Sequence, residues 1–253
     1  MTEYTDHFGP VGLRTRGTVV VVPGRGESQA TYARFGKRLA ADAYRVRVVD
    51  GPRIDADDVT GSLAGFGDRL TAAVEGTATG DGTVGPVVFI GADTGAAAVA
   101  ALVGRSSSVR QPEAVVLAGL PGRSAGTGGS WDDELDIRTS CPAHRGVLTD
   151  DSRAERGSLD VAVPGELLDL AHHGDITVPT LILVGEADPL ADHDALARTA
   201  KSLSRSRLAV VRDAHHDVLN DLQHRSVAAE VVTFLEALRT ALVPAVAVES
   251  SAW

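Results

Sequence analysis

Short runs of valine and other apolar residues alternate along this chain with segments of helical periodicity. Residues 18–22 form a continuous apolar run that stops at Pro23-Gly24, which is typical of a buried strand. The next segment, 32–41, carries apolar side chains three to four positions apart, which predicts a helix. The same reasoning predicts further strands at 44–50, 86–90, 114–120, 180–184 and 208–211, and further helices at 63–74, 94–103 and 227–242.

Strands that alternate with helices predict right-handed βαβ units, and therefore an α/β fold with one mostly parallel sheet and helices on both faces. The length of 253 residues suits a single domain, 1–253. Residues 122–178 break the alternation, because they are rich in Gly, Ser, Asp and His and have no strong helical period before about Pro164. We expect this segment to be a lid or cap inserted over the carboxyl edge of the sheet.

The charge balance and the cysteine content exclude several classes of function. Acidic residues outnumber basic ones by 34 to 24, and the net charge of −10 disfavours nonspecific binding to nucleic acid. No apolar run approaches the roughly 20 residues of a membrane span, and the N-terminus lacks the features of a secretory signal. Cys141 is the only cysteine, which favours the reducing cytoplasm. We therefore expect a cytoplasmic protein with a small-molecule substrate and neither a membrane nor a nucleic-acid partner. The apolar part of the 243–253 tail leaves a homodimer open.

Polar turns follow three of the predicted strands, at the edge of the sheet where ligands bind in this class of fold. The first turn is Gly91-Ala92-Asp93-Thr94-Gly95, between a strand and a helix. Glycines two positions either side of a central residue allow a tight turn that strains this residue and presents its side chain above the sheet. Asp93 therefore becomes a candidate functional residue. The alternative is a plain N-cap of the helix that begins at Thr94.

The second and third turns supply an acid and a histidine. Asp188 lies in the turn 185–190, where a carboxylate could orient a histidine, although a plain Asp-Pro turn is the better explanation of this turn taken alone. His215 and His216 lie in the loop 213–221, after the last strand. The order of nucleophile, acid and histidine, each after a strand, predicts that a histidine of this loop meets Asp93 and Asp188 in space.

Together these turns resemble the α/β-hydrolases, in particular the monoacylglycerol-lipase and serine-aminopeptidase branch of the lysophospholipase-like proteins. The resemblance covers residues 17–105 and 178–240. Its motifs are an oxyanion loop (Pro23-Gly24-Arg25-Gly26-Glu27-Ser28), a nucleophile elbow (91–95), an acid turn (184–189) and a histidine followed by an acidic residue, two apolar residues, Asn and a second acid (216–221). This register selects His216 over His215.

The resemblance implies an α/β-hydrolase fold and a catalytic triad of Asp93, His216 and Asp188. It also implies an oxyanion hole beside Gly24, built from the backbone N–H groups of Arg25 and Thr94. Two departures stand out: Pro23 replaces the usual histidine of the oxyanion loop, and Asp93 replaces the usual nucleophilic serine.

An aspartate at the elbow changes the chemistry that is available. A carboxylate that attacks an ester forms an anhydride and must expel a far more basic alkoxide, so the adduct collapses back. Attack on a saturated carbon instead forms a stable alkyl ester, which is how the related haloalkane dehalogenases and epoxide hydrolases work. Two carboxylates beside His216 should raise its pKa, and alkylation of Asp93 should then turn His216 into a better base.

The residue that activates the leaving group is not evident from the sequence. No tyrosine lies in 122–178, and Trp131, the only aromatic residue there, could bind a halide, although covering apolar surface is the better explanation. His144, Arg145, His172 or His173 could donate a hydrogen bond instead. We expect a hydrolase; the alternatives are a lyase or cyclase that uses Asp93 as a general base, and an inactive small-molecule binder. We expect neither a cofactor nor a metal, since Gly24-Arg25-Gly26 lacks a third glycine and His172-His173-x-Asp175 matches no standard ligand set.

Overall fold

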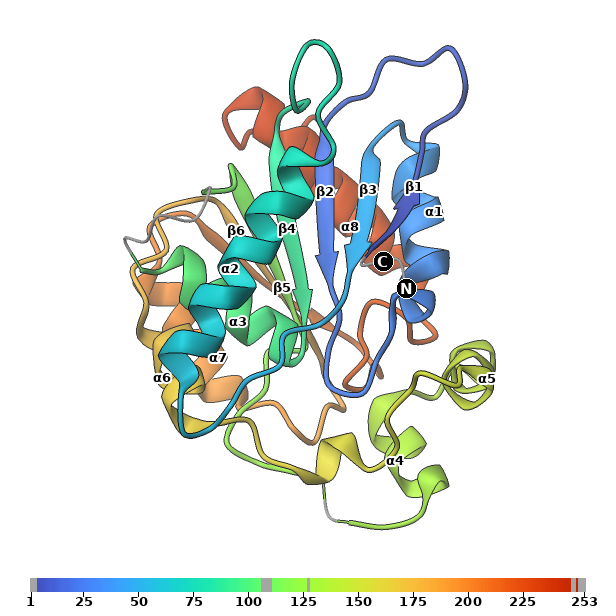
Figure 1. Ribbon diagram of the computed structural model, residues 1–253, viewed down its shortest axis with the longest axis vertical. Coiled ribbons are helices and arrows are strands. Elements are labelled where there is room, and N and C mark those ends of the chain that lie inside the picture. Colours follow the sequence, from blue (N-terminus) through green and yellow to red (C-terminus); the bar gives the residue numbers. More distant parts are fainter. Residues whose placement is uncertain (1–3, 106–110, 127, 247–248, 250–253) are drawn as a thin grey trace.

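The computed structural model describes residues 4–105, 111–126, 128–246 and 249. Within this part of the chain, seven strands form one sheet in the order β1-β3-β2-β4-β5-β6-β7 (Figure 1). The strands are β1 (Tyr4–His7), β2 (Thr18–Val22), β3 (Arg45–Val49), β4 (Val87–Ala92), β5 (Ala114–Ala118), β6 (Thr180–Gly185) and β7 (Ser206–Val211). All neighbours are parallel except β1, which pairs antiparallel with β3. The predicted parallel sheet is therefore confirmed.

Helices cover both faces of this sheet (Figure 1). One apolar core joins the sheet to α2 (Val59–Glu75), α3 (Thr94–Val103), α6 (Gly165–His173) and α7 (His193–Ser202). A second core, on the other face, joins it to α1 (Ala33–Ala41) and α8 (His224–Ala237). The helices are placed as the alternating pattern predicts, because each strand that is apolar on both sides needs a covering layer on both faces.

Strands β2 and β4 lie side by side although β3 separates them in the sequence, with Val22 opposite Gly91. The chain adds β3 on one side of β2 and then crosses over to add β4 on the other side. This crossover is the topological switch point of the sheet, where α/β folds form ligand sites beyond the carboxyl ends of the strands. The loop after β2 and the elbow after β4 therefore meet at the predicted edge.

The segment 122–178, called the insert below, contains more helix than the sequence predicts. Helices α4 (Trp131–Arg138) and α5 (Pro142–Asp150) precede α6, and a 3-10 turn, η2 (Ser158–Asp160), lies between α5 and α6. The expectation of little helix before Pro164 is thus wrong. The reason is that α4 and α5 bury polar side chains as well as apolar ones, which hides the helical period of hydrophobicity. Local signals do mark both helices: a capping box at Ser130 and a proline in the first turn of α5.

The insert divides into two parts. Helix α6 packs with α3 in the core and belongs to the layer that covers the sheet. Helices α4 and α5 lie beyond the carboxyl ends of the strands (Figure 1). This part is tied to the loop after β2, because Arg138 donates a hydrogen bond to the carbonyl of Arg25 at 2.8 Å and the amide of Glu155 donates to the carbonyl of Gly26 at 2.9 Å.

The ends of the chain differ from the expectations in two places. Strand β1 is an unpredicted edge strand, and the predicted helix 227–242 ends at Ala237, where a 3-10 turn, η3 (Leu238–Thr240), follows. Part of the 243–253 tail, on which the homodimer alternative rests, lies outside the described residues. Residues 1–3 lie outside them as well. No helix in the described ranges has the length and hydropathy needed to cross a bilayer.

Candidate active site

Asp93 lies on a strained turn between β4 and α3. Its φ of 46° and ψ of −120° form a conformation that residues with a side chain rarely adopt. The turn closes only because its flanking residues are glycines: a Cβ on Gly91 would lie 2.5 Å from the carbonyl oxygen of Gly95, and a Cβ on Gly95 would lie 2.5 Å from that of Pro23. Although Asp93 occupies the N-cap position of α3, its side chain makes no capping hydrogen bond. Its carboxylate is directed into the site, so the N-cap alternative does not hold.

The structure brings the three predicted triad residues together. Asp93 Oδ1 lies 3.1 Å from Nε2 of His216, and Nδ1 of His216 lies 2.9 Å from Oδ2 of Asp188. All three residues are buried, with exposed fractions of 4% or less. The neighbouring His215 faces Asp221 at 3.1 Å instead, as the register of the resemblance implies.

Arg25 provides the unexpected feature of the site. Its backbone N–H and its Nε both donate to Oδ2 of Asp93 at 2.8 Å, and its Nη2 donates to Oδ1 at 2.8 Å. The hydroxyl of Thr94 adds a longer contact to Oδ2, at 3.2 Å. The backbone N–H that the resemblance implies for a substrate oxyanion thus binds the protein's own carboxylate. The amide of Gly24 donates to Glu27 at 2.8 Å, so Gly24 contributes close approach to Asp93 rather than a free donor.

The protonation states follow from these contacts. Burial raises the pKa of Asp93, but the Arg25 guanidinium and His216 lower it by more and hold it well below its usual range. Burial lowers the pKa of His216, but Asp188 and Asp93 raise it by more, to about 10. At neutral pH Asp93 is therefore ionised and His216 is protonated.

The raised pKa of His216 predicts a pH dependence of stability. Because the folded-state pKa of about 10 lies above the ordinary 6.5, protonated His216 stabilises the fold fully below about pH 6.5 and loses this effect as the pH rises through 10. We expect the difference in unfolding free energy between the wild type and His216→Gln to be largest near pH 6.5 and to shrink toward pH 10. Urea denaturation across this range measures the difference, and a constant value would contradict the charged state of His216.

Little open space adjoins the triad. The cavity beside Asp93 and His216 has a volume of about 10 Å³, which is too small for a substrate. Two wider grooves, of about 680 and 770 Å³, are lined by other residues, the first between α1 and α5 and the second beside α6 and α7. In this conformation Arg25 covers the carboxylate, so a substrate reaches Asp93 only if the Arg25 side chain or the insert moves.

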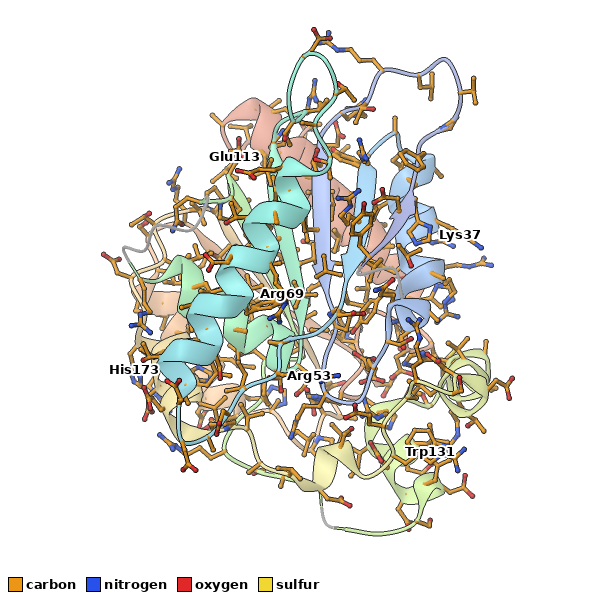
Figure 2. All side chains as sticks on the ribbon, in the orientation of Figure 1. Lys37, Arg53, Arg69, Glu113, Trp131 and His173 are labelled. Carbon is orange, nitrogen blue, oxygen red and sulfur yellow. The ribbon has the colours of Figure 1, made fainter. Side chains whose placement is uncertain are left out.

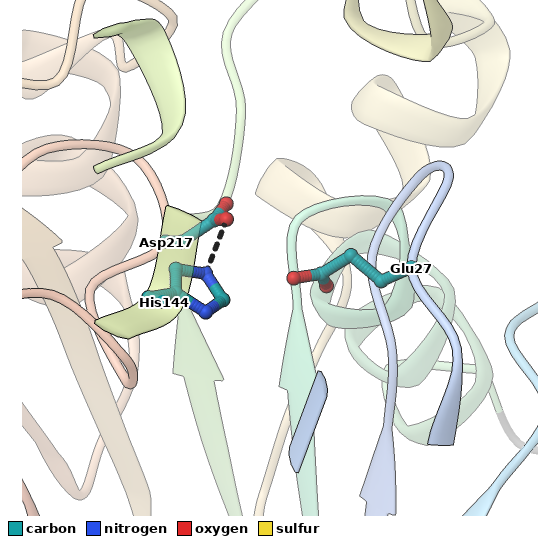
Figure 3. Close-up of side chains that lie close together, drawn as sticks. All are labelled: Glu27, His144 and Asp217. Carbon is teal, nitrogen blue, oxygen red and sulfur yellow. Dashed lines mark hydrogen bonds and ion pairs between the residues drawn. The ribbon is translucent and has the colours of Figure 1, made fainter. Parts of the chain in front are cut away.

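A second buried cluster of charged residues adjoins the triad. Glu27 faces the pair formed by His144 and Asp217, whose Nε2 and Oδ2 atoms are 2.8 Å apart (Figure 3). Glu27 accepts hydrogen bonds from the amide of Gly24 and from the hydroxyl of Tyr32. Burial, followed by the charge of Asp217, raises the pKa of Glu27 to about 7. Through Gly24 this cluster fixes the loop that carries Arg25.

The same cluster offers ligand atoms that could hold a metal ion, one each from Glu27, His144 and Asp217, within 4.8 Å of one another. However, Nη1 of the buried Arg138 lies 3.6 Å from Oδ1 of Asp217. Arg138 also donates to Glu134 at 2.8 Å. Because Asp217 already pairs with both Arg138 and His144, we infer that the cluster has a structural role, in which it joins the insert to the loop after β2.

The side chains that the sequence offered as hydrogen-bond donors from the insert have other partners. His144 contacts Asp217, Arg145 contacts Asp136, His172 contacts Thr199, His173 contacts the carbonyl of Asp169, and Trp131 contacts Thr149. Trp131 lies on the outer part of the insert, and His173 lies at the end of α6 (Figure 2).

The side chain of Arg25 is the functional group that sequence reasoning missed. The resemblance implies a role for its backbone N–H but none for its guanidinium. The signal was present, since Arg25 and Glu27 are charged residues placed directly after a buried strand, and Arg25 stands between two glycines. A charged side chain at that edge of a parallel sheet should be examined as a site residue in its own right.

Comparison with known proteins identifies the fold. No protein-family model and no curated protein matches the sequence. Among solved structures, the chain is similar to the monoacylglycerol lipase of Paleococcus ferrophilus, with a TM-score of 0.67, 15% identity and coverage of 93% of this chain and 98% of that chain. A soluble variant of Saccharomyces cerevisiae monoglyceride lipase is similar with a TM-score of 0.69 and 14% identity, over 93% of this chain and 91% of that chain. The enol-lactonase of Burkholderia xenovorans LB400 is similar with a TM-score of 0.62 and 19% identity, over 92% of this chain and 95% of that chain. The chain therefore has the α/β-hydrolase fold, as predicted.

Proposed function

We propose that this protein of α/β-hydrolase fold is a hydrolase that acts on a small, largely apolar molecule, with Asp93 as nucleophile, His216 as base and Asp188 as the acid that orients His216. The observation that carries the proposal is that the two oxygens of the Asp93 carboxylate have different neighbours. Oδ1 faces Nε2 of His216 at 3.1 Å, whereas Oδ2 accepts the backbone N–H of Arg25 at 2.8 Å. One oxygen is thus placed beside the base and the other in the position of an oxyanion. Lipases and a lactonase among the similar structures support a hydrolytic role.

The geometry fits a two-step route through an alkyl ester. In the first step, a lone pair of Asp93 Oδ1 forms a bond to a saturated carbon of the substrate, and the leaving group departs with its bonding electrons. After alkylation, His216 releases its resting proton to solvent; in the second step it removes a proton from water, and the resulting hydroxide attacks Cγ of the ester. Oδ2 becomes the oxyanion beside the N–H of Arg25. Collapse releases the alcohol, which takes the proton from His216. The new carboxyl group of Asp93, which carries one oxygen from water, then gives its proton to His216 and returns to the carboxylate.

The electrostatics favour this order of events. The low pKa of Asp93 keeps the nucleophile ionised, and protonated His216 cannot act as a base in the resting site. Alkylation removes the charge of Asp93, so the pKa of His216 falls when water must be activated. The same low pKa disfavours the lyase or cyclase alternative, because a weakly basic carboxylate is a poor general base.

A second candidate function, that of a small-molecule binder without turnover, is favoured by one observation. Arg25 pairs with both oxygens of Asp93, and the adjoining cavity measures only about 10 Å³. A protein that no longer performs chemistry at Asp93 could keep this pair as part of its core.

A substrate panel separates the two functions. We expect the wild type to hydrolyse a member of the haloalkane or epoxide classes, measured by halide release or diol formation, and to leave aryl esters intact. The variant His216→Ala should fail on the same compound. If no compound is turned over but one raises the melting temperature of the wild type, the binder is the better account.

A further inference from the structure

The guanidinium of Arg25 forms a largely buried, bidentate ion pair with the carboxylate of Asp93. Nε reaches Oδ2 and Nη2 reaches Oδ1 of Asp93, each at 2.8 Å, and the exposed fraction of the Arg25 side chain is 12%. Its third nitrogen, Nη1, extends past the carboxylate to the backbone carbonyl of Val161 in the insert. Val161 itself is 68% exposed, so this end of the guanidinium faces the more open side of the site.

Alkylation of Asp93 would leave this cation without a negative partner. The ester that forms is neutral, and the remaining contact of the guanidinium, the Val161 carbonyl, carries no net charge. Arg25 cannot release its proton, because a guanidinium stays charged in proteins. A largely buried cation that loses the one ionic partner it has among the described residues is strongly unfavourable. A replacement anion at Arg25 would remove this cost.

We propose that Arg25 binds the anion that the substrate expels, and so serves as the missing activator of the leaving group. The inference rests on the proposed function, since it supplies the activator that the alkyl-ester route needs. In the step, Asp93 Oδ1 forms the new C–O bond, and the C–X bond breaks with both electrons passing to X. The guanidinium exchanges one anion, the carboxylate, for another, X⁻. The charge of the site is unchanged, and no proton, oxidant or reductant takes part.

This exchange selects the class of substrate. A halide leaves as a separate, weakly basic anion, which a guanidinium can hold by charge and hydrogen bonds alone. An opened epoxide instead leaves an alkoxide that stays attached to the carbon skeleton and must be protonated, which Arg25 cannot do. The assignment therefore favours haloalkanes over epoxides.

Chloride binding to Asp93→Asn tests the assignment without any turnover. The neutral amide has the size of the carboxylate and the charge of the alkylated residue, so this variant should expose the anion site at Arg25. We expect ³⁵Cl NMR line broadening at constant ionic strength to show chloride affinity about tenfold or more above that of the wild type, because one adjacent negative charge is gone. Asp93→Ser serves as a second neutral variant if the asparagine variant does not fold.

The controls separate Arg25 from general charge effects. The double variant Asp93→Asn/Arg25→Gln should return to the chloride affinity of the wild type. Asp93→Asn/Arg14→Gln, which removes an exposed arginine with no ionic partner among the described residues, should keep the gain. A folded Asp93→Asn or Asp93→Ser that binds no more chloride than the wild type would overturn the assignment, and so would a gain that survives Arg25→Gln.

Failure of this assignment can be told from failure of the proposed function. If Asp93→Asn loses turnover and gains no chloride affinity, Asp93 remains the nucleophile and only the role of Arg25 is lost. If Asp93→Asn keeps full turnover, the nucleophile itself is wrong, whatever the variant does with chloride.

Discussion

Replacement of Asp93 by asparagine should lower turnover by about four orders of magnitude or more while the chain still folds. The amide has nearly the same shape as the carboxylate, so the elbow between Gly91 and Gly95 is preserved, but its oxygen is too weak a nucleophile to attack a saturated carbon. Substrate hydrolysis under saturating conditions measures the loss, and circular dichroism checks the fold. Unchanged activity would remove both enzymatic roles of Asp93, nucleophile and base.

The same substitution has a cost in stability that must be separated from the loss of turnover. It leaves the Arg25 guanidinium without its ionic partner, and breaking a buried pair in this way costs on the order of 3–5 kcal/mol. His216 can offset part of this cost by releasing its proton, because the carboxylate that helps to raise its pKa is gone. Asp68→Asn is a matched control, since it changes the same group on the exposed face of α2. We expect this control to keep both activity and stability.

Replacement of His216 by glutamine should stop the reaction halfway. Asp93 can still be alkylated, but no base remains to activate water, so hydrolysis of the ester should slow by roughly 10²- to 10⁴-fold. We expect about one equivalent of leaving group per enzyme in a burst, and an intact-protein mass that increases by the alkyl group of the substrate. Peptide mapping should place this group on Asp93.

His215→Gln is the matched control for this experiment, because it changes the adjacent histidine, which faces Asp221. His215→Gln should hydrolyse the substrate at the rate of the wild type and show no adduct. If His216→Gln gives neither a burst nor an adduct while the wild type is active, the alkyl ester is not an intermediate.

The architecture could be predicted because its central strands are buried on both sides. All five residues of β2 are buried, and such continuous apolar runs between helical segments have few alternatives to a parallel sheet. Strand β1 escaped prediction because it is short and half-exposed, and its Asp6 is held by Arg47, a contact between distant segments. Helix α5 could not be predicted from hydrophobic periodicity, because one of its two buried side chains is polar: it buries His144 and Leu148.

The proximity of the three proposed triad residues could be predicted because topology, rather than side-chain conformation, brings them together. Asp93, Asp188 and His216 each follow a parallel strand or its loop, and the carboxyl ends of those strands share one edge of the sheet. The ion pair of Arg25 with Asp93 could not be predicted in this way. It joins residues 68 positions apart through a flexible side chain, and only the burial of both groups fixes it.

A single turnover in water enriched with ¹⁸O tests the role of Asp93 most directly. Enzyme in excess over substrate completes one cycle, and mass spectrometry then examines both the alcohol product and the peptide that contains Asp93. We predict that the Asp93 carboxylate gains one ¹⁸O atom and that the alcohol carries none, because water attacks the ester carbonyl and the alcohol keeps the oxygen of Asp93. An alcohol that carries the label, together with an unlabelled Asp93, would contradict the account.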